Sequence, residues 1–334
     1  MKFIGLLLML VLTVSISAKE STKLVWPSPP DPARIEFQGI VTKPEDLQIK
    51  KGVFTKVWEF FVGTSNESLV KPFGLHVDEN NRVYISDVGL RAVVILDPNK
   101  NKKLIINGSK KYQLLSPMDI DTDADGNIYI SDSQQGLIHV YNKNATFLRV
   151  IGKEQLHRPV GIAIDAKSKI IYVVDTLKSK IQVYSLSGKY IKTLGKIGAG
   201  DGEFNKPTYI ALDDNDGYLY VSDSMNHRIQ IIDKNGKFIN KFGELGNTMG
   251  SFANPRGITI NKKGHIFVTD TTFHAIQIFN KKGQLLLAIG NYGDQKGEFA
   301  IPEDIVISND GVIYVADSYN MRVQVFKLLE VKTK

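Results

Sequence analysis

Short runs of alternating apolar and polar residues recur along most of the chain. The clearest run ends in Asp and has an aromatic residue three positions earlier, as in VYISD (83–87). A period of two residues is typical of a β-strand with one buried face. The run occurs six times, ending at Asp87, Asp132, Asp175, Asp223, Asp270 and Asp317.

A second apolar run precedes each of these strands and begins near a proline. Successive prolines are 42–48 residues apart, at Pro72, Pro117, Pro159, Pro207, Pro255 and Pro302. Two further runs follow in the clearest copies, as in IQIID (229–233) and GKFINKFG (236–243). Four short antiparallel strands in each of six units predict an all-β, six-bladed β-propeller over residues 56–334.

The last unit stops after its third strand, so ring closure needs a fourth strand from elsewhere in the chain. Lys56–Gly63 (KVWEFFVG) has the pattern of the fourth strands, and we predict that it pairs with the last blade. Closure by an N-terminal strand would cover the sheet edges that an open ring exposes. Residues 19–55 form a Pro-containing arm, in which Ile35–Val41 is a candidate extra strand over a blade edge.

The first 18 residues have the order of a secretory signal peptide. Lys2 precedes the apolar run Phe3–Val14, and small residues follow at 15–18. The run is short for a membrane span, and an uncleaved anchor is the alternative. We therefore expect an exported protein, periplasmic or extracellular, without a membrane span after cleavage. The chain has no cysteine, which excludes disulfides, cysteine-based metal or nucleophilic sites and a lipid-modified N-terminal cysteine.

The composition is that of a globular protein with a sizeable core, since 43% of the 334 residues are hydrophobic and 23% are charged. The formal charge of +7 becomes +6 when Lys2 is removed. The excess lysines lie in small clusters beside predicted turns, such as NKNKK (99–103), which indicates solvated hairpin tips. A weak attraction to anionic surfaces is the alternative. Export separates such a protein from nucleic acids, so a nucleic-acid partner is not expected.

Two segments resemble NHL repeats, which are named after their Asn-His-Leu consensus: DSMNHRIQII (223–232) and DSYNMRVQVF (317–326). Three loops between units keep the spacing G-x-x-G-x-x-x-G-x-F-x-x-P that is typical of NHL proteins. The resemblance covers about residues 58–327 and is weaker in the first three units. It implies a six-bladed propeller of the secreted bacterial type. In such a fold the inter-blade loops and the loops between second and third strands share one face, the usual binding face of a propeller.

The six strand-end aspartates allow two interpretations. Each carboxylate would accept hydrogen bonds from loop N–H groups and hold a tight turn, or the six would form a ring of acids for a metal or substrate. An Asp in every blade meets a need that all blades share, so we favour the structural role. Arg228 and Arg322 stand five residues after their Asp and are expected to pair with a nearby Asp, with ligand recognition as the alternative.

Two places suggest a metal ion. The stretch DTDADGNIYISD (121–132) resembles an EF-hand-type calcium loop, although a strand is predicted where that motif has a helix, and a polar hairpin turn is the alternative. The calcium candidates, and with them the only cofactor suggested, are Asp121, Asp123 and Asp125. His227 and His274 occupy matching positions in adjacent units. Such positions are expected to be about 10 Å apart, too far for two ligands that must each lie about 2 Å from one zinc ion.

A metal-dependent lyase or lactonase acting in the channel is the second functional hypothesis. NHL-type peptidyl-amidoglycolate lyases can place a zinc-binding His directly after the Pro that opens a blade. The matching residues here include no His; they are Phe73, Met118, Val160, Thr208, Arg256 and Glu303. Related lactonases hold calcium with channel carboxylates and Asn, whereas Asp119, Glu303 and Asp304 have no repeated Asn set beside them. Phosphate-loop, dinucleotide-binding and serine-hydrolase motifs are absent from the ring.

The sequence favours a monomeric, non-catalytic binding or scaffold module that recognises a protein or a polymer such as a polysaccharide. Irregular and partly apolar loops on a rigid ring suit this kind of recognition. The candidate residues of the ligand face are Arg91, Lys178, Met225, His227, Arg256, Phe273, His274, Glu303, Tyr319 and Met321.

Overall fold

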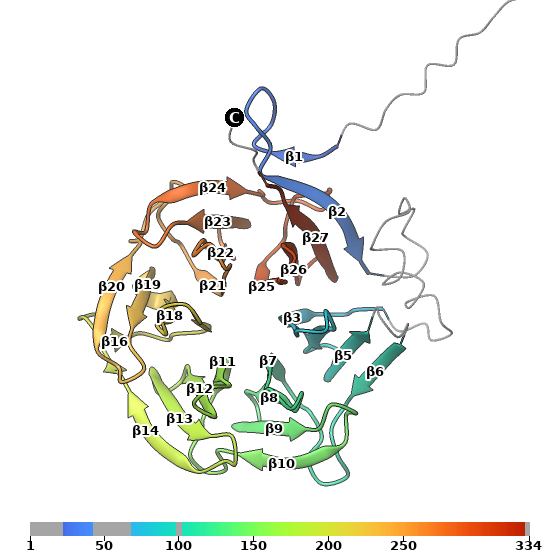
Figure 1. Ribbon diagram of the computed structural model, residues 1–334, viewed down its shortest axis with the longest axis vertical. Helices are drawn as coiled ribbons and strands as arrows, with labels where there is room; N and C mark the ends of the chain where they lie inside the picture. The colour runs from blue at the N-terminus through green and yellow to red at the C-terminus, as the bar shows by residue number, and fades with distance from the viewer. Residues whose placement is uncertain (1–22, 43–67, 98–101, 331–334) are drawn as a thin grey trace, which may run out of the picture.

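The computed structural model describes residues 23–42, 68–97 and 102–330. Six antiparallel sheets surround a central channel, and the chain passes through them in sequence order (Figure 1). The predicted all-β, six-bladed propeller is therefore confirmed. Within the described ranges, no helix is long and apolar enough to cross a membrane.

The strands of each blade are ordered from the channel to the rim. Blade 1 contains β3 (Pro72–Val77), β4 (Val83–Asp87), β5 (Ala92–Asp97) and β6 (Lys102–Ile106). Blade 2 contains β7 (Pro117–Thr122), β8 (Ile128–Asp132), β9 (Leu137–Tyr141) and β10 (Phe147–Ile151). Blade 3 contains β11 (Pro159–Asp165), β12 (Ile170–Asp175), β13 (Lys180–Ser185) and β14 (Tyr190–Leu194). Blade 4 contains β17 (Ile210–Leu212), β18 (Leu219–Asp223), β19 (Arg228–Ile232) and β20 (Phe238–Phe242). Blade 5 contains β21 (Pro255–Ile260), β22 (Ile266–Asp270), β23 (Ala275–Phe279) and β24 (Leu285–Ile289). Blade 6 contains β25 (Pro302–Ile307), β26 (Val312–Asp317) and β27 (Arg322–Leu328).

An N-terminal strand completes blade 6, as predicted, but it is not the expected one. β2 (Ile35–Val41) runs antiparallel to β27, and β1 (Val25–Trp26) pairs with the outer side of β2 (Figure 1). β2 therefore occupies the edge that was assigned to Lys56–Gly63, which lies outside the described residues. The physical reason is aromatic packing, because the rings of Trp26 and Phe37 lie 5.7 and 5.6 Å from that of Phe326.

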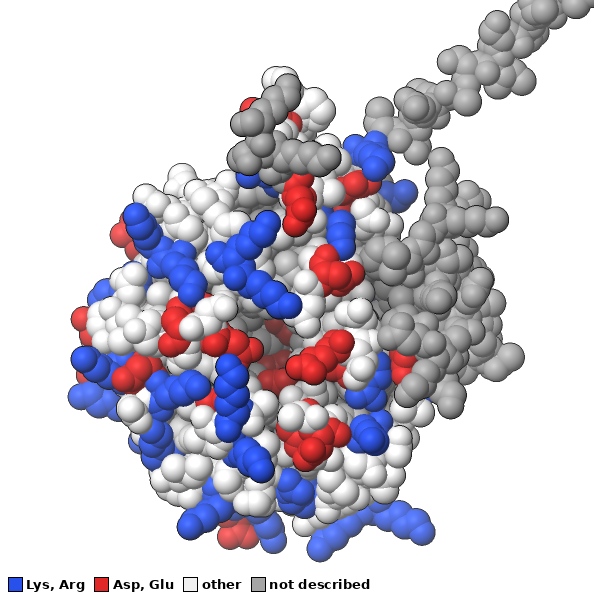
Figure 2. All heavy atoms as spheres, in the orientation of Figure 1, with Lys and Arg blue, Asp and Glu red and all other residues white. Residues whose placement is uncertain are grey.

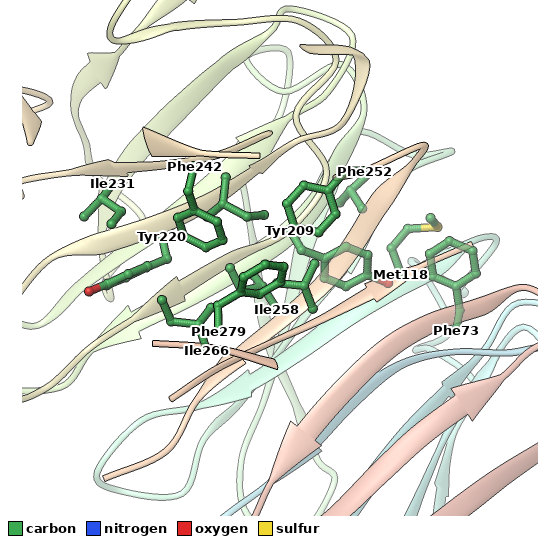
Figure 3. Close-up of a cluster of buried hydrophobic side chains, with 13 residues drawn as sticks. Phe73, Met118, Tyr209, Tyr220, Ile231, Phe242, Phe252, Ile258, Ile266 and Phe279 are labelled. Carbon is green, nitrogen blue, oxygen red and sulfur yellow. The ribbon is translucent and has the colours of Figure 1, made fainter. Parts of the chain in front are cut away.

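The core lies between the blades rather than within each one. The aromatic residue three positions before each strand-end Asp packs against the second and third strands of the next blade. Tyr220 of blade 4, for example, contacts a cluster that contains Ile266 and Phe279 of blade 5 (Figure 3). Tyr314 of blade 6 packs in the same way into the core of blade 1, so the ring is closed by side chains as well as by β2. Burying such a ring stabilises the fold by about 1.5–3 kcal/mol.

Candidate functional site

The six strand-end aspartates lie where two loop systems meet, and all six are fully buried. Asp223 Oδ1 accepts the Asn205 N–H at 2.7 Å, and Asp317 Oδ1 accepts the Ala300 N–H at 2.7 Å. Each carboxylate thereby ties an inter-blade loop to the end of a second strand. The same bond is made in the other blades by Asp87, Asp132, Asp175 and Asp270. The six aspartates therefore accept hydrogen bonds from loop N–H groups, which is the structural role that the sequence favoured over a ring of acids.

Two arginines add to this arrangement in blades 4 and 6. Arg228 Nε lies 2.9 Å from Asp223 Oδ2, and its other nitrogens donate to three carbonyls of the preceding inter-blade loop. Arg322 repeats the pattern, with Nε 2.6 Å from Asp317 Oδ2. The side chains of Arg228 and Arg322 are only 8% and 7% exposed. Their guanidinium groups therefore hold a loop rather than face a ligand.

A buried phenylalanine ring explains the first glycine of each inter-blade loop with the G-x-F pattern. Phe252 is fully buried, and a Cβ on Gly243 would lie only 2.3 Å from its ring. Gly243 also has a φ of +89°, which residues with a Cβ rarely adopt. The same contact recurs between Gly290 and Phe299, where the distance would be 2.4 Å. The first Gly and the Phe of the spacing are therefore one packing unit that makes the loop rigid.

These rigid loops hold a repeated apolar residue in solvent. Ile197, Leu245 and Tyr292 stand two positions after the first loop glycine and are 67%, 68% and 68% exposed. Each pairs in parallel with the buried Phe of its own loop, which fixes its backbone. Sequence reasoning missed these residues. The available signal was an apolar residue at the same place in three Gly-rich loops, where a polar residue is expected.

The predicted ligand-face residues differ in exposure. Four of them are exposed, namely Arg91, Met225, Tyr319 and Met321. Five are half-buried: Lys178, His227, Arg256, Phe273 and His274. Glu303 is buried in the channel wall, so it lies below the loop surface.

The residue before the third strand has a left-handed backbone conformation in every blade. Its φ lies between +53° and +64° at Arg91, Gly136, Ser179, His227, His274 and Met321. The two histidines have separate partners, because His227 Nδ1 lies 2.8 Å from the Ala253 carbonyl oxygen and His274 Nδ1 lies 3.1 Å from the Ile301 nitrogen. The structure therefore gives each imidazole its own loop contact.

The candidate calcium loop is a polar hairpin turn. Asp123 Oδ1 accepts the Asp125 N–H at 3.0 Å, and Asp123 Oδ2 accepts the Tyr129 hydroxyl at 3.1 Å. Asp121 lies on β7 instead and accepts the Ile164 N–H of blade 3 at 2.7 Å. Among the residues that the structure describes, no three His, Cys, Asp or Glu side chains form a group that could hold a metal ion. The three acids are thus not brought together as calcium ligands.

The channel wall alternates between glycine and a large side chain. Two positions after the opening proline, blades 1 to 6 carry Gly74, Asp119, Gly161, Tyr209, Gly257 and Asp304. A Cβ on Gly257 would lie 2.5 Å from Asp304 Cα, and a Cβ on Gly161 would lie 2.6 Å from Tyr209 Cα. The glycines therefore let neighbouring first strands approach closely, and three polar side chains enter the channel from alternate blades.

Two of these side chains are buried acids. Asp119 Oδ2 accepts the Ile162 N–H at 2.9 Å, and Asp304 Oδ2 accepts the Leu75 N–H at 2.8 Å, so each ties its blade to the next. Burial, together with the nearby Asp304 carboxylate, raises the pKa of Asp119 well above its usual range. Burial also raises the pKa of Asp304 to about 8. Figure 2 shows acidic side chains around the central hollow.

The third side chain, Tyr209, reaches across the channel. Its ring is directed toward Met118 and Phe73 (Figure 3) and lies 6.5 Å from the Phe73 ring. Tyr209 is buried, and its hydroxyl has no hydrogen-bond partner among the described residues. Beside it, Arg256 Nε lies 3.7 Å from Glu303 Oε2.

A third-strand glutamine secures the inter-blade loops of the later blades, and blade 2 has a histidine in its place. Gln230 donates to the Glu203 carbonyl at 2.5 Å and accepts the Gly202 N–H at 3.0 Å. His139 has the equivalent register on β9, is fully buried, and neither ring nitrogen has a partner among the described residues. Burial lowers the pKa of His139 below its usual value.

We expect His139→Gln to make the protein more resistant to mild acid. The unfolded chain takes up a proton on His139 near pH 6.5, whereas the buried imidazole resists protonation, so the wild type loses stability as pH falls below 6.5. The loss approaches about 1.4 kcal/mol per pH unit below that point. The difference in melting temperature between variant and wild type should grow from pH 7.5 to pH 5. A difference that is constant with pH would contradict the assignment.

Two family profiles match the chain. The profile of DUF5128, a 6-bladed beta-propeller, matches residues 113–193 and 159–229, and that of the NHL repeat matches residues 252–279 and 299–326. Protein brain tumor of Drosophila melanogaster is 28% identical over 159 residues, which are 46% of this chain and 15% of that protein. Gluconolactonase of Zymomonas mobilis is 26% identical over 136 residues, 36% of this chain and 38% of that enzyme. The chain thus spans well under half the length of these curated relatives.

Solved structures share the fold at low identity. A protein of unknown function from Bacteroides thetaiotaomicron is 16% identical with a TM-score of 0.63, over 79% of this chain and 71% of that one. An auxiliary nutrient binding protein from the same organism is 14% identical with a TM-score of 0.62, over 79% and 70%. Virginiamycin B lyase from Staphylococcus aureus is 16% identical with a TM-score of 0.56, over 78% and 96%. With its closed ring of blades, its loop-anchoring aspartates and both profile matches, the chain is a six-bladed β-propeller protein that carries NHL repeats and a DUF5128 propeller domain.

Proposed function

We propose that the protein is an exported, non-catalytic binding module that recognises a protein or polymer with its inter-blade-loop face. The distribution of exposed large hydrophobic side chains carries this proposal. In the described ranges, ten lie on this face, eight lie on fourth strands at the rim, Leu24 lies next to β1, and none lies on the hairpins of the opposite face. The ten are Val70, Leu177, Ile197, Met225, Leu245, Met249, Tyr292, Ile301, Tyr319 and Met321.

The physical properties of this face favour a large ligand. Exposed apolar side chains that gather on one surface commonly mark an interaction site. The loops of Ile197, Leu245 and Tyr292 are each anchored by a buried Phe, and the Tyr292 ring packs 4.9 Å from that of His274. Side chains that are already ordered lose little conformational freedom on binding, which favours affinity.

The comparisons support a binding role in part. The auxiliary nutrient binding protein has the same fold over most of its length. The N-terminal 18 residues add the expectation of export, which N-terminal sequencing of the protein from the extracytoplasmic fraction would test by giving a chain that starts at Lys19.

Substituting the repeated apolar residues of the face should abolish ligand capture. Immobilised protein (residues 19–334) would be incubated with the extracytoplasmic extract of its own cells. The triple variant Ile197→Ser, Leu245→Ser, Tyr292→Ser removes side chains that protrude into solvent, so we expect it to fold normally and to retain less than about one tenth of the captured ligand.

The matched control changes equally apolar residues on the rim. Tyr190→Ser, Ile191→Ser and Leu286→Ser alter side chains that are 42%, 44% and 50% exposed on fourth strands. This control should capture the ligand as the wild type does. Equal capture by both triple variants would refute recognition by the inter-blade-loop face.

A channel enzyme of the metal-dependent lyase or lactonase class is the second candidate. The observation that favours it is the group of buried acids Asp119, Glu303 and Asp304 in the channel, together with partial similarity to a gluconolactonase. A stoichiometric zinc or calcium ion in the purified protein, lost together with a measurable turnover on chelation, would replace the binding-module proposal.

A further inference from the structure

Asp119 and Asp304 are buried acids without a cationic partner. Each is about 95% buried, and no Lys, Arg or His of the described residues forms an ion pair with either. Each carboxylate oxygen accepts one backbone N–H, from Ile120 and Ile162 or from Leu75 and Ile305, which leaves further acceptor capacity on every oxygen. Without a positive partner both buried carboxyl groups resist ionisation, and a cation bound beside them would favour their charged forms.

Tyr209 supplies a third acceptor at the same level of the channel. It is 2% exposed, and its hydroxyl oxygen is unpartnered among the described residues. Burial first, and then the charges of Asp304, Glu303 and Asp119, raise the pKa of Tyr209 well above its usual value. The three groups come from blades 2, 4 and 6, separated by the glycines of the other blades.

We propose that the channel binds a primary ammonium group, with Asp119, Tyr209 and Asp304 as its three hydrogen-bond acceptors. An –NH₃⁺ group has three N–H donors and no acceptor, which matches three acceptors placed on alternate blades around one axis. Its positive charge compensates the two carboxylates. Glu303 does not take part in the same way, because Arg256 already lies beside it.

The side chains next to the acids indicate the chemistry of the rest of the ligand. One position above the acids, on the side of the inter-blade loops, blades 1 to 3 contribute Phe73, Met118 and Val160. These buried apolar side chains, which belong to one cluster with Tyr209, favour an alkyl group over a polar group next to the ammonium. The ligand class is therefore a small alkylammonium compound, and this site is independent of the inter-blade-loop face.

Calorimetric titration of the protein (residues 19–334) with n-butylammonium chloride tests the proposal. We expect saturable binding of n-butylammonium. n-Butanol has the same chain without the charge, and butyltrimethylammonium has the charge without N–H donors; both should bind at least about 10-fold more weakly. Equal binding of either analogue, or no heat from n-butylammonium at millimolar concentration, would overturn the proposal.

The variant Tyr209→Phe removes only the unpartnered oxygen. It should weaken n-butylammonium binding about 2- to 10-fold without loss of folding. Tyr184→Phe is the matched control, because the Tyr184 hydroxyl is also buried and unpartnered but lies on β13, away from the channel. Asp304→Asn should weaken binding about 10-fold or more, although it also changes a bond to blade 1. Unchanged affinity in Tyr209→Phe would refute the three-acceptor site even if Asp304→Asn fails to fold.

Discussion

Gly257→Ala is expected to lower the free energy of unfolding by about 3 kcal/mol, the upper part of the range for overpacking in a core. The new Cβ would lie 2.4 Å from Asp304 Oδ1, 2.5 Å from Asp304 Cα and 2.8 Å from the Ile305 nitrogen. Two of these atoms belong to the backbone of β25, which is paired with β26 and cannot move away alone. The collision would separate blades 5 and 6 at the channel, and urea denaturation would measure its cost.

Gly250→Ala is the control for this prediction. Gly250 has a φ of +100°, but a Cβ there would meet nothing closer than Leu285 Cβ at 4.0 Å. Its substitution therefore tests backbone strain without collision, at a cost of about 1–2 kcal/mol. If the two alanine variants unfold at the same urea concentration, close approach of the blades is not what Gly257 provides.

The blades could be predicted because the sequence repeats its strand signals. The aromatic residue and Asp of each second strand mark a register that recurs six times, and the structure pairs Asp223 with Arg228 and Asp317 with Arg322 at the predicted hairpins. The prediction that Lys56–Gly63 closes the ring was wrong. It was made because this segment resembles a fourth strand more closely than Ile35–Val41 does. The pairing of β2 with β27 depends on contacts between residues that are far apart in the sequence, such as the rings of Phe37 and Phe326. A local sequence pattern does not reveal such contacts.

Only part of the candidate site was accessible from the sequence. Repetition identified the loop-anchoring role of the six aspartates, because a residue needed by every blade is rarely specific to one ligand. The sequence indicated Asp119 and Asp304 as channel acids, but it did not indicate Tyr209, because this residue of blade 4 meets Phe73 of blade 1 only across the ring. The sequence also did not indicate that Leu245 is exposed, because its exposure depends on the loop conformation that the buried Phe252 fixes.

Arg228→Met is expected to lower the free energy of unfolding by about 3 kcal/mol, because removing one partner of a buried ion pair leaves an uncompensated charge. Asp223 is fully buried and would lose the one cation that pairs with it among the described residues, although the Asn205 N–H and the side-chain amides of Asn226 and Gln230 would still donate to it. Three carbonyls of the loop that enters blade 4 would each lose a hydrogen bond from the guanidinium, although the Gln230 side chain would still donate to the Glu203 carbonyl. Thermal and urea unfolding of the purified variant would measure the loss.

Two comparisons separate the buried ion pair from a general effect of losing a positive charge. Lys241→Met breaks a pair of 2.6 Å with Asp201, but those side chains are 44% and 53% exposed, so its cost should stay below about 1 kcal/mol. Adding Asp223→Asn to Arg228→Met removes the stranded charge and should recover part of the stability. If Arg228→Met costs no more than Lys241→Met, the guanidinium does not hold the loop, and ligand recognition by Arg228 becomes the better interpretation of its place beside Asp223.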